Sequence, residues 1–136
     1  MTICKSLKTY ENWAWLLIRV SVGATFIAHG MQKWAIWSAP AGQLWSMTTI
    51  MKILSIAEPL GGLGLILGIL TPWAALGLVI IMLGALYSKI TGNVLFTGGR
   101  GVGWEFDLLL LASNLLIMIS DGGKYVLEKL WTKESD

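Results

Sequence analysis

Apolar residues run in four long stretches along the chain, separated by shorter segments that hold most of the charged and turn-forming residues. The stretches cover residues 13–30, 50–70, 73–90 and 104–121. A helix that crosses a bilayer needs about 20 mainly apolar residues, with a range of about 17–25, so each stretch has roughly the required length. The pattern predicts an all-α protein, an integral membrane four-helix bundle that forms one domain over residues 1–136.

The tryptophans favour an even number of spans, which places both termini on one side of the membrane. Four of the eight fall near the terminal side of the predicted spans, at Trp13, Trp15, Trp73 and Trp131, and four near the opposite side, at Trp34, Trp37, Trp45 and Trp104. Five lysines on the terminal side against four basic residues on the other weakly favour cytoplasmic termini. Residues 122–136 are predicted to form a charged, amphipathic C-terminal tail.

Composition excludes several classes of protein. Apolar residues make up 55% of the chain and charged residues only 13%, which is too few charges to solvate the surface of a cytosolic enzyme. A net charge of +2 does not suggest a nucleic-acid partner. The single cysteine excludes an internal disulfide and a thiolate metal cluster, so no metal site is expected.

Polar residues within the first span share one face. At about 100° per residue, an arc of about 120° contains Arg19, Gly23, Phe26, His29, Gly30 and Lys33. Charges within a span face the protein interior or a water-filled cavity, so this stripe predicts the inward face of the helix. Arg19 is too deep to reach the interface and therefore needs an acidic or carbonyl partner.

Glu58 is the corresponding charge in the second span, about 9 Å from the side away from the termini. Pro59 cannot donate a backbone hydrogen bond, so the carbonyl of Ser55 loses its usual partner. The same side holds His29, Lys33, Arg100 and Glu105. A polar pocket lined by His29, Glu58 and Glu105 is therefore predicted, although Asp107 lies on nearly the opposite face of the fourth span from Glu105. The alternative is that these charges form structural ion pairs or reach the interface.

Three segments of the chain carry a family resemblance: Arg19-x-x-x-Gly23-x-x-Phe26-x-x-His29-Gly30-x-x-Lys33, Glu58-Pro59-Leu60-Gly61-Gly62-x-x-x-x-x-Gly68 and Gly103-Trp104-Glu105-Phe106. In this order, over residues 13–123, they resemble signatures of the DoxX-like membrane proteins. The resemblance implies a four-helix protein of the bacterial cytoplasmic (inner) membrane. Some relatives are subunits of a thiosulfate:quinone oxidoreductase, and others are linked to redox and quinone stress.

Two functions remain open at this point. The first is a quinone-interacting or redox-complex membrane subunit, with His29, Glu58 and Glu105 as candidate catalytic residues. Arg19, Lys33 and Arg100 are the candidate substrate-binding residues. The cofactor expected is a non-covalent isoprenoid quinone, and because flavin, haem and iron–sulfur motifs are absent from the sequence, electrons would come from a redox partner protein.

The alternative is a non-enzymatic role, as a small transporter or a membrane scaffold for a partner enzyme. Buried Arg19 and Glu58 suit an ion path, and the glycine-lined helix faces suit packing into a homo-oligomer. Both functions share the lipid bilayer as a partner.

Overall fold

The computed structural model describes residues 7–40, 46–92, 97, 101–120 and 122–129. Their elements are the 3-10 helix η1 (Lys8–Tyr10), α2 (Glu11–Gln32), the 3-10 helix η2 (Lys33–Ser38), α3 (Met47–Leu67), α4 (Thr71–Thr91) and α5 (Trp104–Ile119). The protein is therefore an all-α, integral membrane four-helix bundle, and each of the four predicted ranges overlaps one of the long helices. Whether all four cross the membrane stays a prediction.

Three of the helices, α2 to α4, are long and apolar enough to cross a membrane. The fourth, α5, has 16 residues and so measures about 24 Å. Apolar side chains are exposed along all four helices, among them Leu17, Leu60, Ile80 and Leu109. Such exposure on apolar helices indicates contact with lipid rather than with water.

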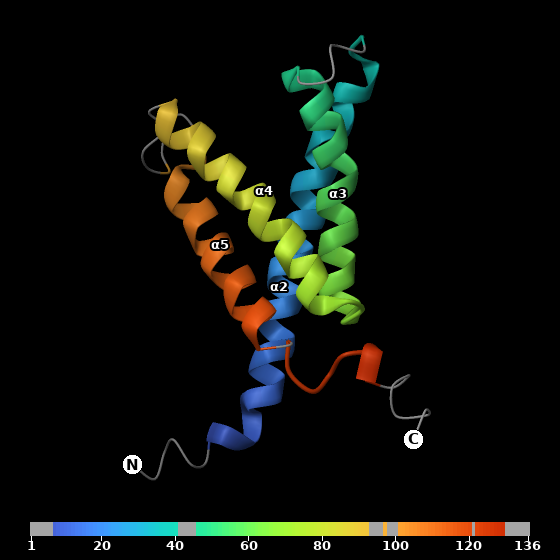
Figure 1. The fold of residues 1–136 in the computed structure, drawn as a ribbon, viewed down its shortest axis with the longest axis vertical. Coiled ribbons are helices and arrows are strands. Elements are labelled where there is room, and N and C mark those ends of the chain that lie inside the picture. The colour runs from blue at the N-terminus through green and yellow to red at the C-terminus, as the bar shows by residue number, and fades with distance from the viewer. Residues whose placement is uncertain (1–6, 41–45, 93–96, 98–100, 121, 130–136) are drawn as a thin grey trace.

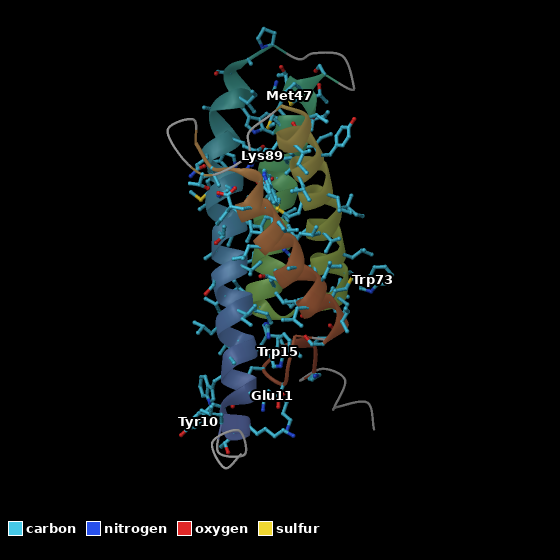
Figure 2. The ribbon with its side chains drawn as sticks, turned by 90° about the vertical axis from the view of Figure 1, so that its left-hand side faces the viewer. Tyr10, Glu11, Trp15, Met47, Trp73 and Lys89 are labelled. Atoms are coloured by element: carbon cyan, nitrogen blue, oxygen red, sulfur yellow. The ribbon has the colours of Figure 1, made fainter. Side chains whose placement is uncertain are left out.

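The helices pack mainly as two pairs, α2 with α3 and α4 with α5 (Figure 1). The pairs meet at the α3–α4 turn and diverge toward the other end (Figure 1). Viewed from the side, the pairs lie one in front of the other and Lys89 is near the divergent end (Figure 2). The apolar core between them consists of Val22, Phe26, Leu65, Ala75, Leu78, Val79, Met82, Leu110, Leu111 and Ile117.

Glycine allows α2 and α3 to approach closely along their whole contact. A Cβ atom on Gly23 would clash with the carbonyl oxygen of Gly62, and one on Gly62 would clash with that of Gly23. One heptad further, a Cβ atom on Gly30 would clash with the ring of Pro59. The predicted inward stripe of the first span is thus the surface that packs on α3.

A tight turn joins α3 to α4 at the end of the molecule where the described chain begins and ends. Gly68 ends α3 in the left-handed conformation, with φ at 70°, and its N–H bonds to the carbonyl of Gly64 at 2.9 Å. This explains why α3 stops at Leu67, three residues before the predicted boundary.

The described part of the tail, residues 122–129, crosses the end of α3. The N–H groups of Leu127 and Glu128 donate to the carbonyls of Leu67 and Gly68, each at 3.2 Å. Residues 122–127 form turns and irregular backbone, and helical conformation begins only at Glu128. The rest of the predicted amphipathic tail lies outside the described residues.

Candidate functional site

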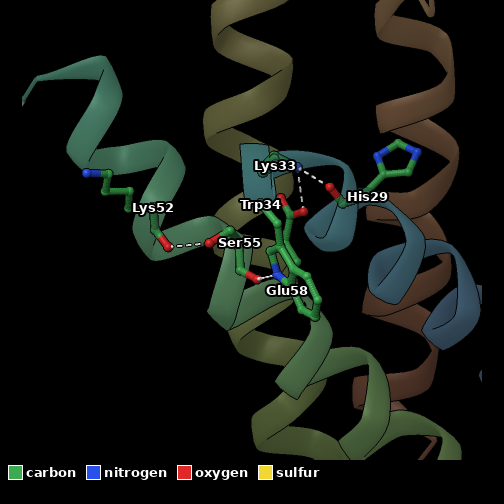
Figure 3. A network of polar contacts seen from close by, with 6 residues as sticks. All are labelled: His29, Lys33, Trp34, Lys52, Ser55 and Glu58. Carbon is green, nitrogen blue, oxygen red and sulfur yellow. Dashed lines mark hydrogen bonds and ion pairs between the residues drawn. The ribbon is translucent and has the colours of Figure 1, made fainter. Parts of the chain in front are cut away.

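Lys33, the first residue of η2 after α2, forms an ion pair with Glu58 of α3 at the end of the bundle away from the described termini (Figure 3). Lys33 Nζ lies 2.6 Å from Glu58 Oε2, and the two side chains are 22% and 4% exposed. Lys33 also donates to the carbonyl of His29 at 3.1 Å, in the last turn of α2. A nearly buried carboxylate needs such a partner, because an uncompensated charge in an apolar interior is costly.

A second ion pair joins α4 to α5. Lys89 Nζ, in the last turn of α4, lies 2.8 Å from Asp107 Oδ2 in the first turn of α5. Asp107 and Asn114 are buried on the inward face of α5, which resolves the ambiguity in the sequence about which face points inward. This ion pair was not predicted from the sequence. A lysine at the end of one helix, followed by an acidic residue on the polar face of the next helix, would have indicated it.

His29 connects the two helix pairs at this level. Its imidazole stacks on the ring of Phe106, with centroids 5.7 Å apart and planes 25° from parallel. In Figure 3 the imidazole points away from Lys33 and Glu58, toward α5. Within the part of the chain that the structure describes, no hydrogen bond engages either imidazole nitrogen. We call the region that holds His29 and the Lys33–Glu58 and Lys89–Asp107 pairs the polar end.

Glu105 also belongs to the polar end but has different neighbours. One of its oxygens accepts a hydrogen bond from the backbone N–H of Thr97. The other, Oε2, is buried without a hydrogen-bond partner among the described residues. Between the described side chains of His29, Glu58 and Glu105 there is no hydrogen bond or ion pair, so a pocket shared by all three stays a prediction. Arg100 lies outside the described residues.

Arg19 lies at the other end of the bundle. Its side chain is fully buried, and its guanidinium donates to four backbone carbonyls. Nε bonds to Leu65 at 2.7 Å, Nη2 to Ile66 at 3.0 Å, and Nη1 to Gly122 at 3.3 Å and Tyr125 at 2.5 Å. The prediction of an acidic or carbonyl partner for Arg19 is confirmed, with carbonyls as the partners.

Two of those carbonyls belong to the last turn of α3, where backbone oxygens lack intrahelical partners and the helix dipole is negative. Arg19 therefore lies level with the end of the α2–α3 pair rather than halfway along it. A planar guanidinium with five N–H groups in a fixed fork can serve several carbonyls at once, which a lysine cannot. We call this region, formed by Arg19, the end of α3 and residues 122–126, the terminal end.

Ser55 bonds to two tryptophans of η2, of which Figure 3 shows Trp34. The carbonyl of Ser55, which Pro59 leaves without a helical donor, accepts a hydrogen bond from Trp34 Nε1 at 3.1 Å. The indole of Trp37 donates to Ser55 Oγ at 3.0 Å, and that hydroxyl donates to the carbonyl of Lys52 at 2.7 Å. The freed carbonyl was anticipated from the sequence, but its tryptophan donor was not.

Among the described residues, the polar end offers an imidazole whose nitrogens make no hydrogen bond, two carboxylates paired with lysines and a third carboxylate with one unpaired oxygen. These groups can donate, accept and relay protons. Within the described ranges, no group of three or more His, Cys, Asp or Glu side chains is arranged to hold a metal ion.

Comparison with known proteins gives one match. The model of the DoxX family matches residues 14–91, which include Arg19, His29, Lys33 and Glu58. No curated protein and no solved structure matches the chain. Because the family match covers more than half of the 136 residues, this membrane protein belongs to the DoxX family.

Proposed function

We propose that this DoxX family protein is a quinone-interacting membrane subunit of a redox complex, and that the quinone head group binds at the polar end beside His29. The observation that carries the proposal is the position of the His29 imidazole. It stacks on Phe106 between the two helix pairs, and its nitrogens make no hydrogen bond within the described residues. A stacked imidazole with a free N–H suits a planar ring that carries carbonyl acceptors.

The neighbouring groups suit proton transfer. His29 would donate to a quinone carbonyl, while Glu58, held by Lys33, would relay protons from the polar end. Glu105 Oε2, which has no hydrogen-bond partner among the described residues, is available for the same task. Since the sequence contains no flavin, haem or iron–sulfur motif, the electrons would come from a redox partner protein. In this proposal the membrane is the bacterial inner membrane and both termini are cytoplasmic.

A second function, a non-enzymatic scaffold for a partner enzyme, is supported by the packing of α2 on α3. Arg19 and Lys33 both bond to groups of α3, and Gly23 and Gly30 both contact it. A structural role therefore accounts for most of the first polar stripe. Because carbonyls occupy the guanidinium of Arg19, a scaffold fits better than an ion path. Assembly into a homo-oligomer stays a prediction.

The test is quinone binding by the purified protein. An organic extract should contain quinone, and a soluble short-chain quinone should quench the tryptophan fluorescence in a saturable way. We expect His29→Leu to weaken this binding at least about tenfold, the equivalent of one lost hydrogen bond of about 1.4 kcal/mol. The control is Thr25→Val, because Thr25 bonds only to the carbonyl one turn earlier in its own helix.

Both variants should remain monodisperse in detergent, because the imidazole of His29 contributes stacking but no hydrogen bond among the described residues. A quinone-free extract together with unsaturable quenching would contradict the proposal and leave the scaffold function. Equal affinities in His29→Leu and Thr25→Val would remove His29 from the site.

A further inference from the structure

A groove of about 500 Å³ lies between η2 and α3. Its lining is almost wholly apolar and consists of Trp34, Trp37, Ser55, Ile56, Pro59 and Leu60. Ligand pockets in proteins measure about 300–1,000 Å³, so the groove is large enough for a small molecule or an acyl chain. Ile56 and Leu60 are exposed on an apolar helix, which places this surface against lipid.

The tryptophans in this groove are fixed rather than free to turn. Both indole N–H groups donate to Ser55, one to its carbonyl and one to its hydroxyl. Their faces remain about half exposed, at 54% for Trp34 and 51% for Trp37. Two held indoles beside the ring of Pro59 form a preorganised apolar surface, and a ligand that binds there loses little free energy to ordering the protein.

A lysine that has no acidic partner among the described residues adjoins this surface. Lys52 Nζ lies 5.6 Å from the centre of the Trp37 ring and donates to the carbonyl of Ala39 at 2.9 Å. Lys33 and Lys89 each have a carboxylate within 3 Å. The chain contains no Asp or Glu from Met31 to Ala57, so the neighbouring sequence adds no negative charge beside Lys52.

We propose that this surface binds one anionic phospholipid, with an acyl chain along Trp34, Trp37 and Leu60 and the phosphate at Lys52. Lys52 retains two N–H donors after its bond to Ala39. Basic residues beside membrane helices attract anionic head groups, whereas zwitterionic head groups gain less because their own cation offsets the phosphate charge. The site is separate from the proposed quinone site, because the imidazole of His29 points to α5 and lines no part of the groove (Figure 3).

The experiment measures lipid binding to the purified protein by native mass spectrometry and by thermal stabilisation in detergent. Phosphatidylglycerol should bind and stabilise more strongly than phosphatidylcholine of the same chain length. Lys52→Gln should lower the affinity for phosphatidylglycerol about fivefold, the factor that corresponds to about 1 kcal/mol for one basic residue near an anionic surface. Lys8→Gln is the control, since it removes the same charge from exposed η1 at the other end.

A second variant tests the acyl-chain part without disturbing the fold. Leu60 is 64% exposed, so Leu60→Trp can fill the groove from outside and should reduce binding of both lipids. Equal binding of the two lipids by the wild-type protein would overturn the proposal, as would an unchanged lipid preference in Lys52→Gln. A neutral lipid or a quinone retained in the groove in place of the anionic lipid would overturn it as well.

Discussion

The two ends of the bundle hold their buried charges in different ways. At the terminal end, Arg19 bonds only to backbone carbonyls among the described residues. At the polar end, Lys33 and Lys89 pair with the carboxylates of Glu58 and Asp107, with one ion pair in each of the two helix pairs. Arginine stays protonated, and backbone carbonyls neither titrate nor change rotamer. The hydrogen bonds at the terminal end therefore do not change with pH or with side-chain rotamers.

The polar end can change its bonding because both of its ion pairs are formed between side chains. Lysine and carboxylate groups can exchange partners, and carboxylate and imidazole groups can move protons. This is also the end where the two helix pairs diverge (Figure 1). The terminal end therefore holds the helices together, whereas the side chains at the polar end can exchange partners and protons.

The largest effect is expected at the terminal end. Arg19→Leu removes every hydrogen bond of the guanidinium and leaves carbonyls of α3 and of the tail without a donor. Hydrogen bonds to a charged group contribute about 1.5–3 kcal/mol each, so the variant should lose at least about 3 kcal/mol of stability. The measurement is the melting temperature in detergent. Lys52→Leu is the control, and equal melting temperatures for the two variants would contradict the structural role of Arg19.

Arg19→Lys gives a finer test of the hydrogen bonds at the terminal end. It keeps the charge but offers a single ammonium in place of the planar fork, so it should recover only part of the lost stability. Full recovery would show that charge alone holds the terminal end. The two ends would then differ in their position in the bundle but not in the kind of bonding that stabilises them.

Much of the fold followed from the sequence because burial in lipid leaves few alternatives to helices. The four apolar stretches and the inward stripe of the first span, which includes Gly23 and Gly30, were both readable as local patterns. Helix ends were less certain, as α3 shows, because Gly68 ends it through a left-handed conformation that hydropathy does not reveal.

The candidate site was only partly predictable because it depends on which side chains meet across helices. Placing His29, Lys33, Glu58 and Glu105 in one half of the membrane required only helix direction and rise. The pairing of Lys33 with Glu58, rather than of His29 with Glu58, depends on the close approach of Gly30 to Pro59. That approach sets the rotation of α2 against α3, which no single helix pattern contains.

An intermediate effect is expected where Trp34 replaces the helical donor that Pro59 cannot supply. Trp34→Phe keeps the ring but leaves the buried carbonyl of Ser55 without its hydrogen bond. A buried unsatisfied group costs about 1–3 kcal/mol. In a Pro59→Ala background the restored N–H can serve that carbonyl, so the cost of Trp34→Phe, measured as a double-mutant cycle of melting curves, should shrink.

Trp37→Phe separates this effect from loss of indole packing. The hydroxyl of Ser55 still has the carbonyl of Lys52 as its acceptor, so this variant should cost less than Trp34→Phe. Its cost should also be the same with Pro59 or Ala at position 59. The stability costs of Trp34→Phe and Trp37→Phe could instead depend equally on the residue at position 59. That result would contradict the idea that Trp34 replaces the missing backbone donor.

The smallest effect is expected when both partners of an ion pair are replaced together. Lys33→Met alone leaves the Glu58 carboxylate, which is 4% exposed, without its lysine partner and should clearly destabilise the protein. Replacing both residues with Met removes the charges together, and a buried pair exchanged for apolar side chains is often neutral, so stability should stay within about 1 kcal/mol of wild type. No single second substitution can rescue Arg19→Leu in this way, because its partners are backbone groups. If the double variant melts as low as Arg19→Leu, the polar end is as structural as the terminal end and the contrast between them fails.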